Sequence, residues 1–377
     1  MIEVTDKSMC CGCSACAGVC PVQCITMTAD SEGFKYPIAD PNICVSCGKC
    51  EQVCPMTSVE TASEKKAYAV RVTQYEQDSS SGGVFSALAE KVLCEGGVVF
   101  GAAFDDGLRL QHIKVDDSSM LGHLRGSKYV QSDVGDIYRQ VKDELSEGRK
   151  VLFSGTPCQV AGLHNFLGKD YPELFTVDLA CHGVPSPKVW DRYVREKGDG
   201  LLGVKFRDKS DGWRKYNIAY IYKDRTERIR FDKDPYMLLF LQNISLRPSC
   251  YDCAFRNGAN CSDVTLADFW SVADAVPQMN DGMGVSAVIV NTLKGKTQID
   301  GFSHRVEVKY EEAVKSNGGF FSTFEIPTGR KDFFEGLDAA IELKKYIRRF
   351  IKTKSTVREA YERLHTLLAT IKRRILS

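Results

Sequence analysis

The sequence predicts a protein of mixed α+β and α/β class in three parts. These are a small cysteine-rich N-terminal domain, an α/β domain with a mixed sheet, and a C-terminal helical tail. Three observations support the prediction: ten of sixteen cysteines lie within the first 54 residues, strand-like and helix-like segments alternate from residue 67, and a basic helical period follows residue 330. The expected domain boundaries are 1–62, 63–330 and 331–377.

The N-terminal domain contains one cysteine pattern twice. The copies are Cys10-x2-Cys13-x2-Cys16-x3-Cys20-Pro21 and Cys44-x2-Cys47-x2-Cys50-x3-Cys54-Pro55. In such runs three thiolates surround one cubane cluster, and the fourth, followed by proline, binds the other cluster. The pattern predicts a bacterial-type ferredoxin-like domain with two 4Fe–4S clusters. The crossed ligand sets are Cys10, Cys13, Cys16 and Cys54 for one cluster, and Cys44, Cys47, Cys50 and Cys20 for the other.

Zinc and disulfides are the alternatives to clusters here. Zinc sites use CxxC pairs separated by a longer loop, which two uninterrupted runs do not match. Disulfides need an oxidising compartment, and the N-terminus MIEVTDKSMCC lacks the basic and apolar regions of a secretory signal. The spacing leaves Cys11 and Cys24 as spare thiols. Gly12 and Gly48 allow the backbone to pass close to a cluster and direct N–H groups at its sulfurs.

Composition restricts the function classes. The chain has 377 residues and 43% hydrophobic residues, which suits two or three globular domains. Its net charge of +1 gives no reason to expect nucleic acid binding. The longest apolar runs, such as Val98 to Phe104, are too short to span a bilayer. Cysteines used as metal ligands favour a reducing cytoplasmic location.

The segment 25–43, between the two cysteine runs, is expected to form a loop and a short ribbon. Beyond residue 66, apolar alternation predicts strands at 67–73, 97–104, 109–115, 150–154, 174–180, 203–207, 215–223 and 285–291. Helical periods predict helices at 83–94, 133–147, 157–167, 188–197 and 235–244. No GxGxxG sequence follows a strand, so a standard dinucleotide-binding unit is not supported.

Six further cysteines follow the N-terminal domain. Cys94 ends a helical segment and is interpreted as a core thiol. The other five are expected in loops: Cys158 and Cys181 each follow a strand, Cys250 and Cys253 form a CxxC pair, and Cys261 comes next. Four of these five are candidates for a third 4Fe–4S cluster. Buried thiols or one zinc ion are the alternatives.

Iron–sulfur clusters carry single electrons, and a flavin converts between one-electron and two-electron chemistry. Two loops are candidate flavin anchors. Ser79–Phe85 contains serines that can cap a helix, and its glycines let a pyrophosphate approach the helix N-terminus. Arg125–Gln131 adds two cations and hydroxyl groups. An ordinary helix cap and an ordinary polar turn are the alternative interpretations.

The tail is basic. From Ile341 to Ser377 there are eleven Lys or Arg and three Glu, a local charge of +8. Its apolar face is expected to contain Leu343, Ile347, Phe350 and Ile351. A second helix is expected to start near Ser355 or Thr356. A solvated basic face is the simpler interpretation; contact with an acidic partner or an anionic membrane surface is the alternative.

Several segments in order carry a family resemblance. They are SSSGGVFSALA at 79–89, RGSKYVQS at 125–132, FSGTPCQVAGL at 153–163, LACHGVPSP at 179–187, RPSCYDCAF at 247–255 and SDVTLADFW at 262–270. Together with the cysteine runs, they resemble the beta subunit family of deazaflavin-coenzyme (factor 420) reducing hydrogenase and dehydrogenase, and most closely its bacterial, ferredoxin-fused members. The resemblance covers about residues 1–330 and leaves the tail out.

The resemblance implies an FAD-binding α/β domain that holds its own 4Fe–4S cluster. The implied cluster ligands are Cys158, Cys181, Cys250 and Cys253, which leaves Cys261 spare. The implied FAD-binding residues are Ser80, Ser81, Gly82, Gly83, Gly126, Ser127, Lys128, Tyr129 and Thr156. Lys128 is the candidate for stabilising a reduced flavin and His182 for relaying a proton, although a histidine beside a cluster cysteine is often a structural hydrogen-bonding residue.

The leading hypothesis is therefore an FAD-dependent iron–sulfur oxidoreductase. It would exchange electrons with a redox partner protein, such as a ferredoxin, and act on a deazaflavin or another unsaturated small molecule. The second hypothesis is an electron-transfer subunit that docks on a catalytic partner and has no substrate of its own, which the basic tail favours slightly. A third is a family member that keeps its clusters as structural groups, without a flavin.

Overall fold

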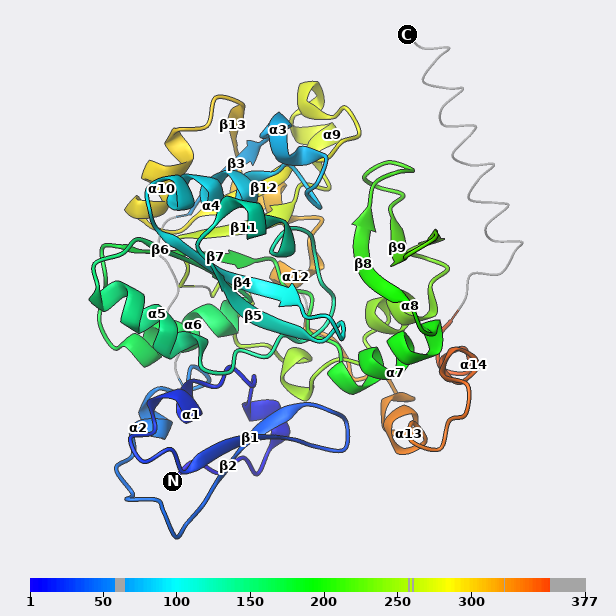
Figure 1. Ribbon diagram of the computed structural model, residues 1–377. Coiled ribbons are helices and arrows are strands. Elements are labelled where there is room, and N and C mark those ends of the chain that lie inside the picture. The colour runs from blue at the N-terminus through cyan, green and yellow to red at the C-terminus, as the bar shows by residue number, and fades with distance from the viewer. Residues whose placement is uncertain (58–64, 257, 260, 322, 353–377) are drawn as a thin grey trace.

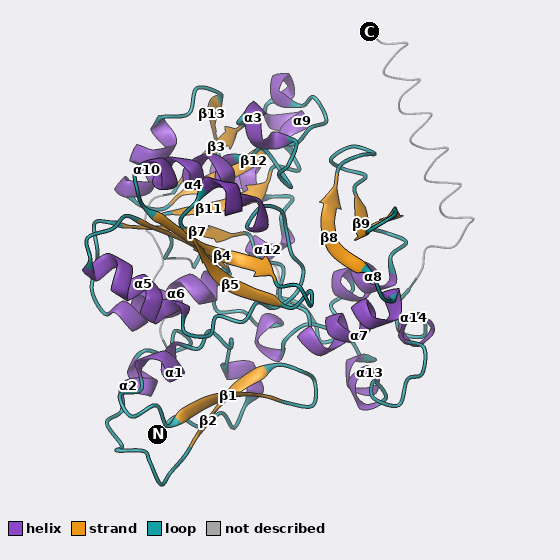
Figure 2. Ribbon diagram, viewed as in Figure 1, coloured by secondary structure: helices purple, strands orange, loops and turns teal. Residues whose placement is uncertain are grey.

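The computed structural model describes residues 1–57, 65–256, 258–259, 261–321 and 323–352. It contains a two-stranded, a three-stranded and an eight-stranded sheet (Figures 1 and 2). In Figure 1 the N-terminal domain lies below the large sheet, and the three-stranded sheet lies to the right of the large sheet. The ferredoxin-like N-terminal domain and the mixed-sheet α/β core predicted from the sequence are both confirmed.

The N-terminal domain is built from short elements around its cysteines. They are η1 (Lys7–Met9), α1 (Ala15–Val19), β1 (Ile25–Ala29), β2 (Lys35–Ala39) and α2 (Lys49–Gln52). Strands β1 and β2 form an antiparallel hairpin, with Ile25 opposite Ala39. The hairpin is the short ribbon expected between the two cysteine runs.

The large sheet has the order β13-β3-β12-β11-β7-β6-β4-β5. Its strands are β3 (Lys66–Val70), β4 (Val98–Phe104), β5 (Leu110–Val115), β6 (Val151–Gly155), β7 (Leu174–Leu179), β11 (Val264–Asp268), β12 (Ser286–Val290) and β13 (Arg305–Val308). Strands β4, β6, β7 and β11 are parallel to one another. Their carboxyl ends therefore meet at one edge of the sheet, where α/β proteins place ligands.

Helices cover both faces of this sheet, so its central strands are buried apolar runs. On one face α4 (Val84–Cys94) and α10 (Leu293–Asp300) pack through residues such as Leu88 and Ile299. On the other face α5 (Ile137–Ser146) and α6 (Pro157–Leu167) pack through residues such as Val141 and Leu163. Ala15 of α1 joins this second core, which attaches the N-terminal domain to the body.

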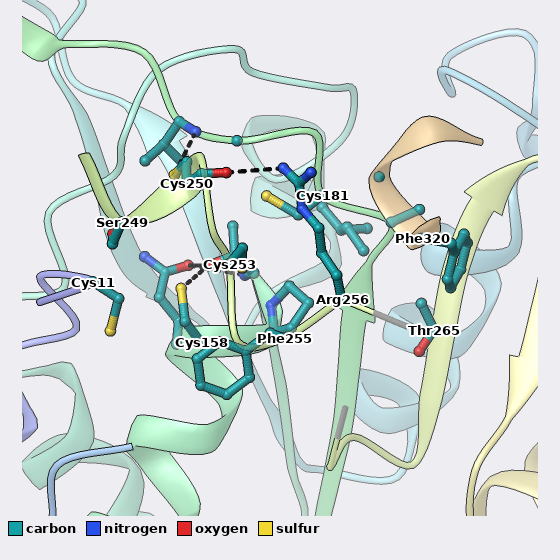
Figure 3. A pocket seen from close by; sticks show the side chains of 18 of the residues that line it. Cys11, Cys158, Cys181, Ser249, Cys250, Cys253, Phe255, Arg256, Thr265 and Phe320 are labelled. Atoms are coloured by element: carbon teal, nitrogen blue, oxygen red, sulfur yellow. Dashed lines mark hydrogen bonds between the residues drawn. The ribbon is translucent and has the colours of Figure 1, made fainter. Parts of the chain in front are cut away.

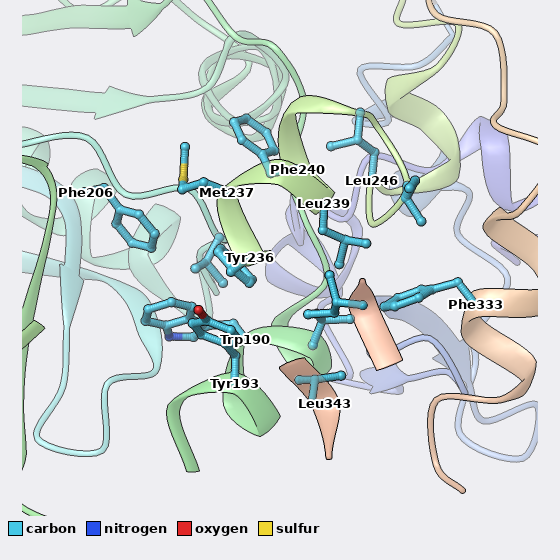
Figure 4. Close-up of a cluster of buried hydrophobic side chains, with 14 of the residues drawn as sticks. Trp190, Tyr193, Phe206, Tyr236, Met237, Leu239, Phe240, Leu246, Phe333 and Leu343 are labelled. Carbon is cyan, nitrogen blue, oxygen red and sulfur yellow. The ribbon is translucent and has the colours of Figure 1, made fainter. Parts of the chain in front are cut away.

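The three-stranded sheet consists of β8 (Leu201–Asp208), β9 (Asn217–Tyr222) and β10 (Thr226–Arg230). It shares a core with α7 (Pro187–Lys197) and α8 (Pro235–Leu241) (Figure 4). The C-terminal helices α13 (Arg330–Glu335) and α14 (Leu343–Ile347) add Phe333, Leu343 and Ile347 to the same core. The described part of the expected tail is thus packed into the body through the apolar face that the sequence predicted.

The remaining elements are short. They are α3 (Thr73–Glu76), η2 (Ser118–His123), η3 (Pro248–Cys250), α9 (Val272–Ala275), η4 (Pro277–Met279), α11 (Tyr310–Val314) and α12 (Gly318–Phe321). Within the described ranges, no helix combines the length and the apolar character that crossing a membrane requires.

Every predicted strand and helix of the α/β body is present, with ends shifted by a few residues. Strands β10, β11 and β13 were not predicted. The interpretation of Cys94 as a core thiol is wrong: it is the last residue of α4 and its side chain is exposed. The helix expected from Ser355 or Thr356 lies outside the described residues.

Candidate functional site

The cysteines of the N-terminal domain surround two separate cavities. The outer cavity is lined by Cys20, Cys44, Cys47 and Cys50, together with the spare Cys24. The inner cavity, of about 210 Å³, is lined by Cys10, Cys13, Cys16 and Cys54, together with the spare Cys11. Each cavity thus takes one cysteine from the opposite run, as the crossed ligand sets require.

The backbone of the two cysteine runs is repeated as well. The residues on either side of the second cysteine have left-handed backbone conformations in both copies: φ is 72° at Gly12 and 69° at Ser14, against 53° at Ser46 and 74° at Gly48. This conformation folds a three-residue spacing into a loop around one centre. In the second copy the Ser46 amide donates to Cys44 Sγ over 3.4 Å, which is the N–H···S contact that tunes a cluster.

A third group of cysteines lines a body cavity (Figure 3). Strand β6 ends at Gly155, and α6 begins at Pro157. Thr156 and Gln159 form a capping box at the start of this helix. Cys158 therefore lies in the first helical turn rather than in the predicted loop. Strand β7 ends two residues before Cys181, on the neighbouring strand. The cysteines that line this cavity are Cys11, Cys158, Cys181, Cys250 and Cys253.

These thiols are held in a buried and partly polar setting. A hydrogen bond with Cys11 and burial raise the pKa of Cys158 well above its ordinary value, and burial raises the pKa of Cys250 to about 12. The Val184 amide donates to Cys250 Sγ over 3.5 Å. The buried Arg256 also lines the cavity, where its Nη2 donates to the carbonyl oxygen of Cys250 while Nε and Nη1 have no hydrogen-bond acceptor among the described residues.

Cys261, which the resemblance leaves as the spare thiol, is not among the described residues that line the body cavity, whereas Cys11 is. Cys11 therefore lines both the inner cavity and the body cavity, and Met56 does the same. Cys10 and Cys11 are consecutive residues. The thiol of Cys10 belongs to the inner set, and the thiol of Cys11 reaches the body set. Spacing alone could not show this, because it depends on how the domain sits on the body.

A loop cavity of about 430 Å³ lies at the carboxyl edge of the large sheet. The predicted flavin-binding residues that line it are Ser80, Ser81, Gly83, Gly126, Ser127, Lys128, Tyr129 and Thr156. Gly82 does not: its amide donates to Ser286 Oγ, and a Cβ there would lie 2.5 Å from the carbonyl oxygen of Val70. Close packing against β3 and β12 therefore explains this glycine.

The two loops contact each other directly. The Ser127 amide donates to Ser80 Oγ over 2.7 Å, which joins the loop before α4 to the loop around Gly126. Gly83 is the N-cap of α4, with φ of 81°, and no side chain caps the helix. The expectation that the serines cap α4 is thus wrong. Among the described residues, no side chain caps the first turn of α4 at the cavity, which suits a phosphate.

The two candidate catalytic residues also line the loop cavity. Lys128 is half-buried, and the loss of solvent around its ammonium lowers its pKa to about 7. Its Nζ donates to the carbonyl oxygens of Leu124, Arg125 and Gly126 over 3.0–3.2 Å. His182 Nε2 lies 2.7 Å from Asn243 Oδ1, and burial lowers the pKa of this imidazole. Both roles stay predictions, and both side chains have structural hydrogen bonds.

Sequence reasoning missed a cationic and aromatic part of the same cavity. Arg207 lines it and is buried, with its guanidinium carbon 4.0 Å from the Tyr216 ring centroid and 4.9 Å from that of Trp270. Asp268, at the end of β11, forms an ion pair with Arg207 over 3.2 Å. Strand β11 was not predicted, so the position of Asp268 at the sheet edge could not be recognised.

The body cavity and the loop cavity share a wall. Both are lined by Thr156, Cys181 and Gly183, among others. With Cys11 shared between the inner and body cavities, the inner, body and loop cavities adjoin one another from the N-terminal domain to the sheet edge.

The thiols stand around cavities and are not gathered about one point. Within the part of the chain that the structure describes, no three Cys, His, Asp or Glu side chains are close enough to hold one metal ion. In a 4Fe–4S cluster each thiolate binds a different iron, so the sulfurs stand around a cavity. Each of the three cavities is lined by five thiols, one more than a 4Fe–4S cluster needs.

Comparison with known families agrees with this arrangement. Residues 148–316 match the family model for the C terminus of the coenzyme F420 hydrogenase/dehydrogenase beta subunit, and residues 9–58 match the "4Fe-4S dicluster domain". The resemblance to the coenzyme F420 hydrogenase/dehydrogenase beta-subunit family that was inferred from the sequence is thus confirmed over residues 148–316, and the dicluster match supports an iron–sulfur redox protein.

Among solved structures, a chain of the F420-reducing NiFe hydrogenase complex from Methanosarcina barkeri is similar, with a TM-score of 0.45 and 16% sequence identity. The match covers 78% of this chain and 90% of that chain. No curated protein sequence gives a significant match.

Proposed function

We propose that this protein is an iron–sulfur flavoprotein oxidoreductase. Its cysteines would hold clusters in the outer, inner and body cavities, and the loop cavity would hold FAD beside a two-electron acceptor such as a deazaflavin or another unsaturated small molecule. The observation that carries the proposal is the sequence of adjoining cavities, in which Cys11 and Cys181 each line two neighbours. Short separations of this kind are what electron transfer between centres requires.

The loop cavity has the features that an FAD would need. The free amides at the start of α4 and the hydroxyls of Ser80 and Ser127 offer donors for a pyrophosphate. Arg207 places a positive charge at the cavity, held between the rings of Tyr216 and Trp270. When bound, the flavin would convert single electrons from clusters into two-electron chemistry.

The body cysteines have neighbours that favour a reduced, more negative cluster. The Val184 amide and the Arg256 nitrogens that lack an acceptor in the described structure are hydrogen-bond donors beside the sulfur set. Hydrogen bonds to cluster sulfurs and nearby positive charge raise the reduction potential. Electrons arriving from the N-terminal domain would thus be stabilised beside the flavin.

The test is the cofactor content of the full chain after anaerobic purification. About twelve irons with matching sulfide, and one FAD, are expected for three clusters and a flavin. Replacement of Cys250 by alanine should remove about four of those irons. About eight irons and no flavin would overturn the reductase and leave only the N-terminal electron carrier.

A second candidate function is an electron-transfer subunit without its own substrate. It is favoured by apolar side chains that lie exposed at the outer cavity or next to it, namely Met1, Val22, Ile43 and Val45. Exposed apolar groups beside a redox centre suit transient docking of a partner protein. Reduction of a small acceptor by the purified chain with dithionite as the electron source would exclude this alternative.

A further inference from the structure

One arginine joins the inner cysteine set to the body set. Arg247 is fully buried, with 0% of its surface exposed, although it is charged at every physiological pH. Its Nε donates to the carbonyl oxygen of Cys10 over 2.7 Å, and its Nη2 lies 3.6 Å from Cys10 Sγ. Further acceptors are the carbonyl oxygen of Lys35 at 2.9 Å and Gln131 Oε1 at 3.1 Å.

The charge of this guanidinium is not balanced by a carboxylate. Among the described residues, its hydrogen-bond partners are two carbonyls, an amide and a thiol. The rings of Tyr36 and Phe34 lie at 4.3 Å and 5.5 Å from its guanidinium carbon. A buried cation without a counter-charge is unfavourable, so an anion at the inner cavity would complete this site. A cluster bound by four thiolates is such an anion.

The backbone of Arg247 is tied to the body set. Its carbonyl oxygen accepts from the Cys250 amide over 2.9 Å, and its amide donates to the carbonyl oxygen of Val184 over 3.0 Å. The Val184 amide in turn donates to Cys250 Sγ. A single residue thus contacts a thiol of the inner set with its side chain and a cysteine of the body set with its backbone.

We propose that Arg247 is a positioning residue that raises the reduction potential of the inner cluster and holds that cluster in a fixed position against the body cysteines. The proposal rests on the cluster assignment of the proposed function. Uptake of one electron adds one negative charge to the cluster and needs no proton and no bond change. A cation at hydrogen-bond distance in a dry site stabilises that added charge more than it would in water.

The outer set has no equivalent cation in the described part of the chain. Three arginines are buried among the described residues, and each belongs to a different centre: Arg247 to the inner set, Arg256 to the body cavity and Arg207 to the loop cavity. The cations that line the outer cavity in the described structure are exposed: they are Lys49 and the N-terminal ammonium of Met1, which pairs with Glu51 over 3.0 Å. The inner cavity is also lined by the carboxylates of Glu3, Asp6 and Glu51, so the buried Arg247 should raise the inner potential above the value that those carboxylates alone would give.

The test is a redox titration of the anaerobic full-length protein, followed by electron paramagnetic resonance. In Arg247→Gln, the equilibrium constant for one-electron reduction of the inner cluster should be about tenfold lower than in the parent protein. This corresponds to a fall of about 59 mV in the reduction potential of that cluster. The outer cluster should not shift. Arg247→Lys keeps the charge and should recover most of the potential.

Arg330 provides the matched control. It also joins the N-terminal domain to the body, since it pairs with Glu32 and donates to the carbonyl oxygen of Leu246, but its charge is balanced by that carboxylate. Arg330→Gln should leave both potentials in place. Equal shifts in Arg330→Gln and Arg247→Gln, or an unchanged inner potential in Arg247→Gln, would overturn the proposal.

Gln131→Glu tests the same idea with the arginine in place, in case Arg247→Gln fails to fold. A carboxylate at the position of Oε1, 3.1 Å from Nη1, should neutralise the guanidinium and lower the inner potential, whereas Gln131→Leu should lower it less. An equal effect of the two variants would contradict a charge effect. Because these potentials belong to the N-terminal domain, they can be measured even if the third cluster and the flavin prove absent.

Discussion

The two halves of the N-terminal domain share one cysteine pattern and one backbone pattern but have different surroundings. The inner set is enclosed by the body, where Arg247, Gln131 and α6 cover it, whereas Cys47 of the outer set is exposed. Identical ligand spacing thus produces two sets that differ in solvent access at one ligand, because Cys47 is exposed whereas the inner ligands are buried or half-buried. Burial, charge and hydrogen bonding differ between them, and these are the factors that set cluster potential and access.

Removing one ligand from each set is the most direct way to test this comparison. Cys54→Ala should cost about four irons per chain and leave the body centres without their neighbour, although Cys10, Cys13 and Cys16 are all still present. Cys20→Ala should also cost about four irons but leave the inner signal intact. Iron and sulfide analysis with electron paramagnetic resonance would distinguish the two.

Loss of the same cluster from both variants would contradict the crossed ligand sets. A milder variant on each side, Cys54→Ser and Cys20→Ser, keeps a weak oxygen ligand and serves as a control for simple unfolding.

The same residues show how much of the N-terminal domain could be predicted from the sequence. Spacing was enough to group the eight N-terminal cysteines, because the loop that surrounds one cluster is local. It could not show which group faces the body, since the covering groups come from Gln131 and Arg247, which are distant in the sequence. It also left Cys11 as a spare thiol, although that side chain lines two cavities.

The body shows the same limit. Strong apolar runs such as β6 and β7 were predicted, and so was the approach of Cys158 and Cys181, because adjacent parallel strands bring their ends together. Strand β11 was missed, and with it the position of Asp268 beside Arg207. Lys128 was chosen for its charge, whereas the fold surrounds its ammonium with three carbonyls of its own loop.

In air, the two clusters of the N-terminal domain should be lost at different rates. On exposure of the reduced protein to air, the outer cluster should be lost first, since Cys47 is exposed while Cys13 and Cys16 are buried. Iron release followed with a chromogenic chelator should therefore be biphasic, and the first phase should contain about four irons. A single phase for both clusters, or earlier loss of the inner signal, would refute the difference in access.

Two glycines with the same conformation offer a matched pair for stability. Gly12 and Gly48 have φ of 72° and 74°, so alanine should cost about 1–2 kcal/mol at either position. A Cβ at Gly12 would lie 2.8 Å from Arg247 Nη1 and 3.0 Å from Gln131 Nε2, whereas a Cβ at Gly48 meets nothing within 4 Å in the described structure. Gly12→Ala should therefore lose about 1–3 kcal/mol more than Gly48→Ala in anaerobic denaturant unfolding. Equal losses would mean that the body does not close tightly on the inner loop.

A substitution at the outer cysteine set is expected to have the smallest effect on stability and the most specific effect on function. Val45 is 59% exposed and lines the outer cavity, so Val45→Ser should change the free energy of unfolding by no more than about 0.5 kcal/mol. If a partner protein delivers electrons at this face, the variant should accept them several-fold more slowly from a reduced ferredoxin. Dithionite needs no docking surface, so reduction by dithionite should be unchanged.

Ile326→Ser, at a side chain 64% exposed and outside the N-terminal domain, is the control and should alter neither rate in stopped-flow measurements. Equal slowing with both reductants would place the defect in the cluster itself, and an unchanged rate with ferredoxin would show that electrons enter elsewhere.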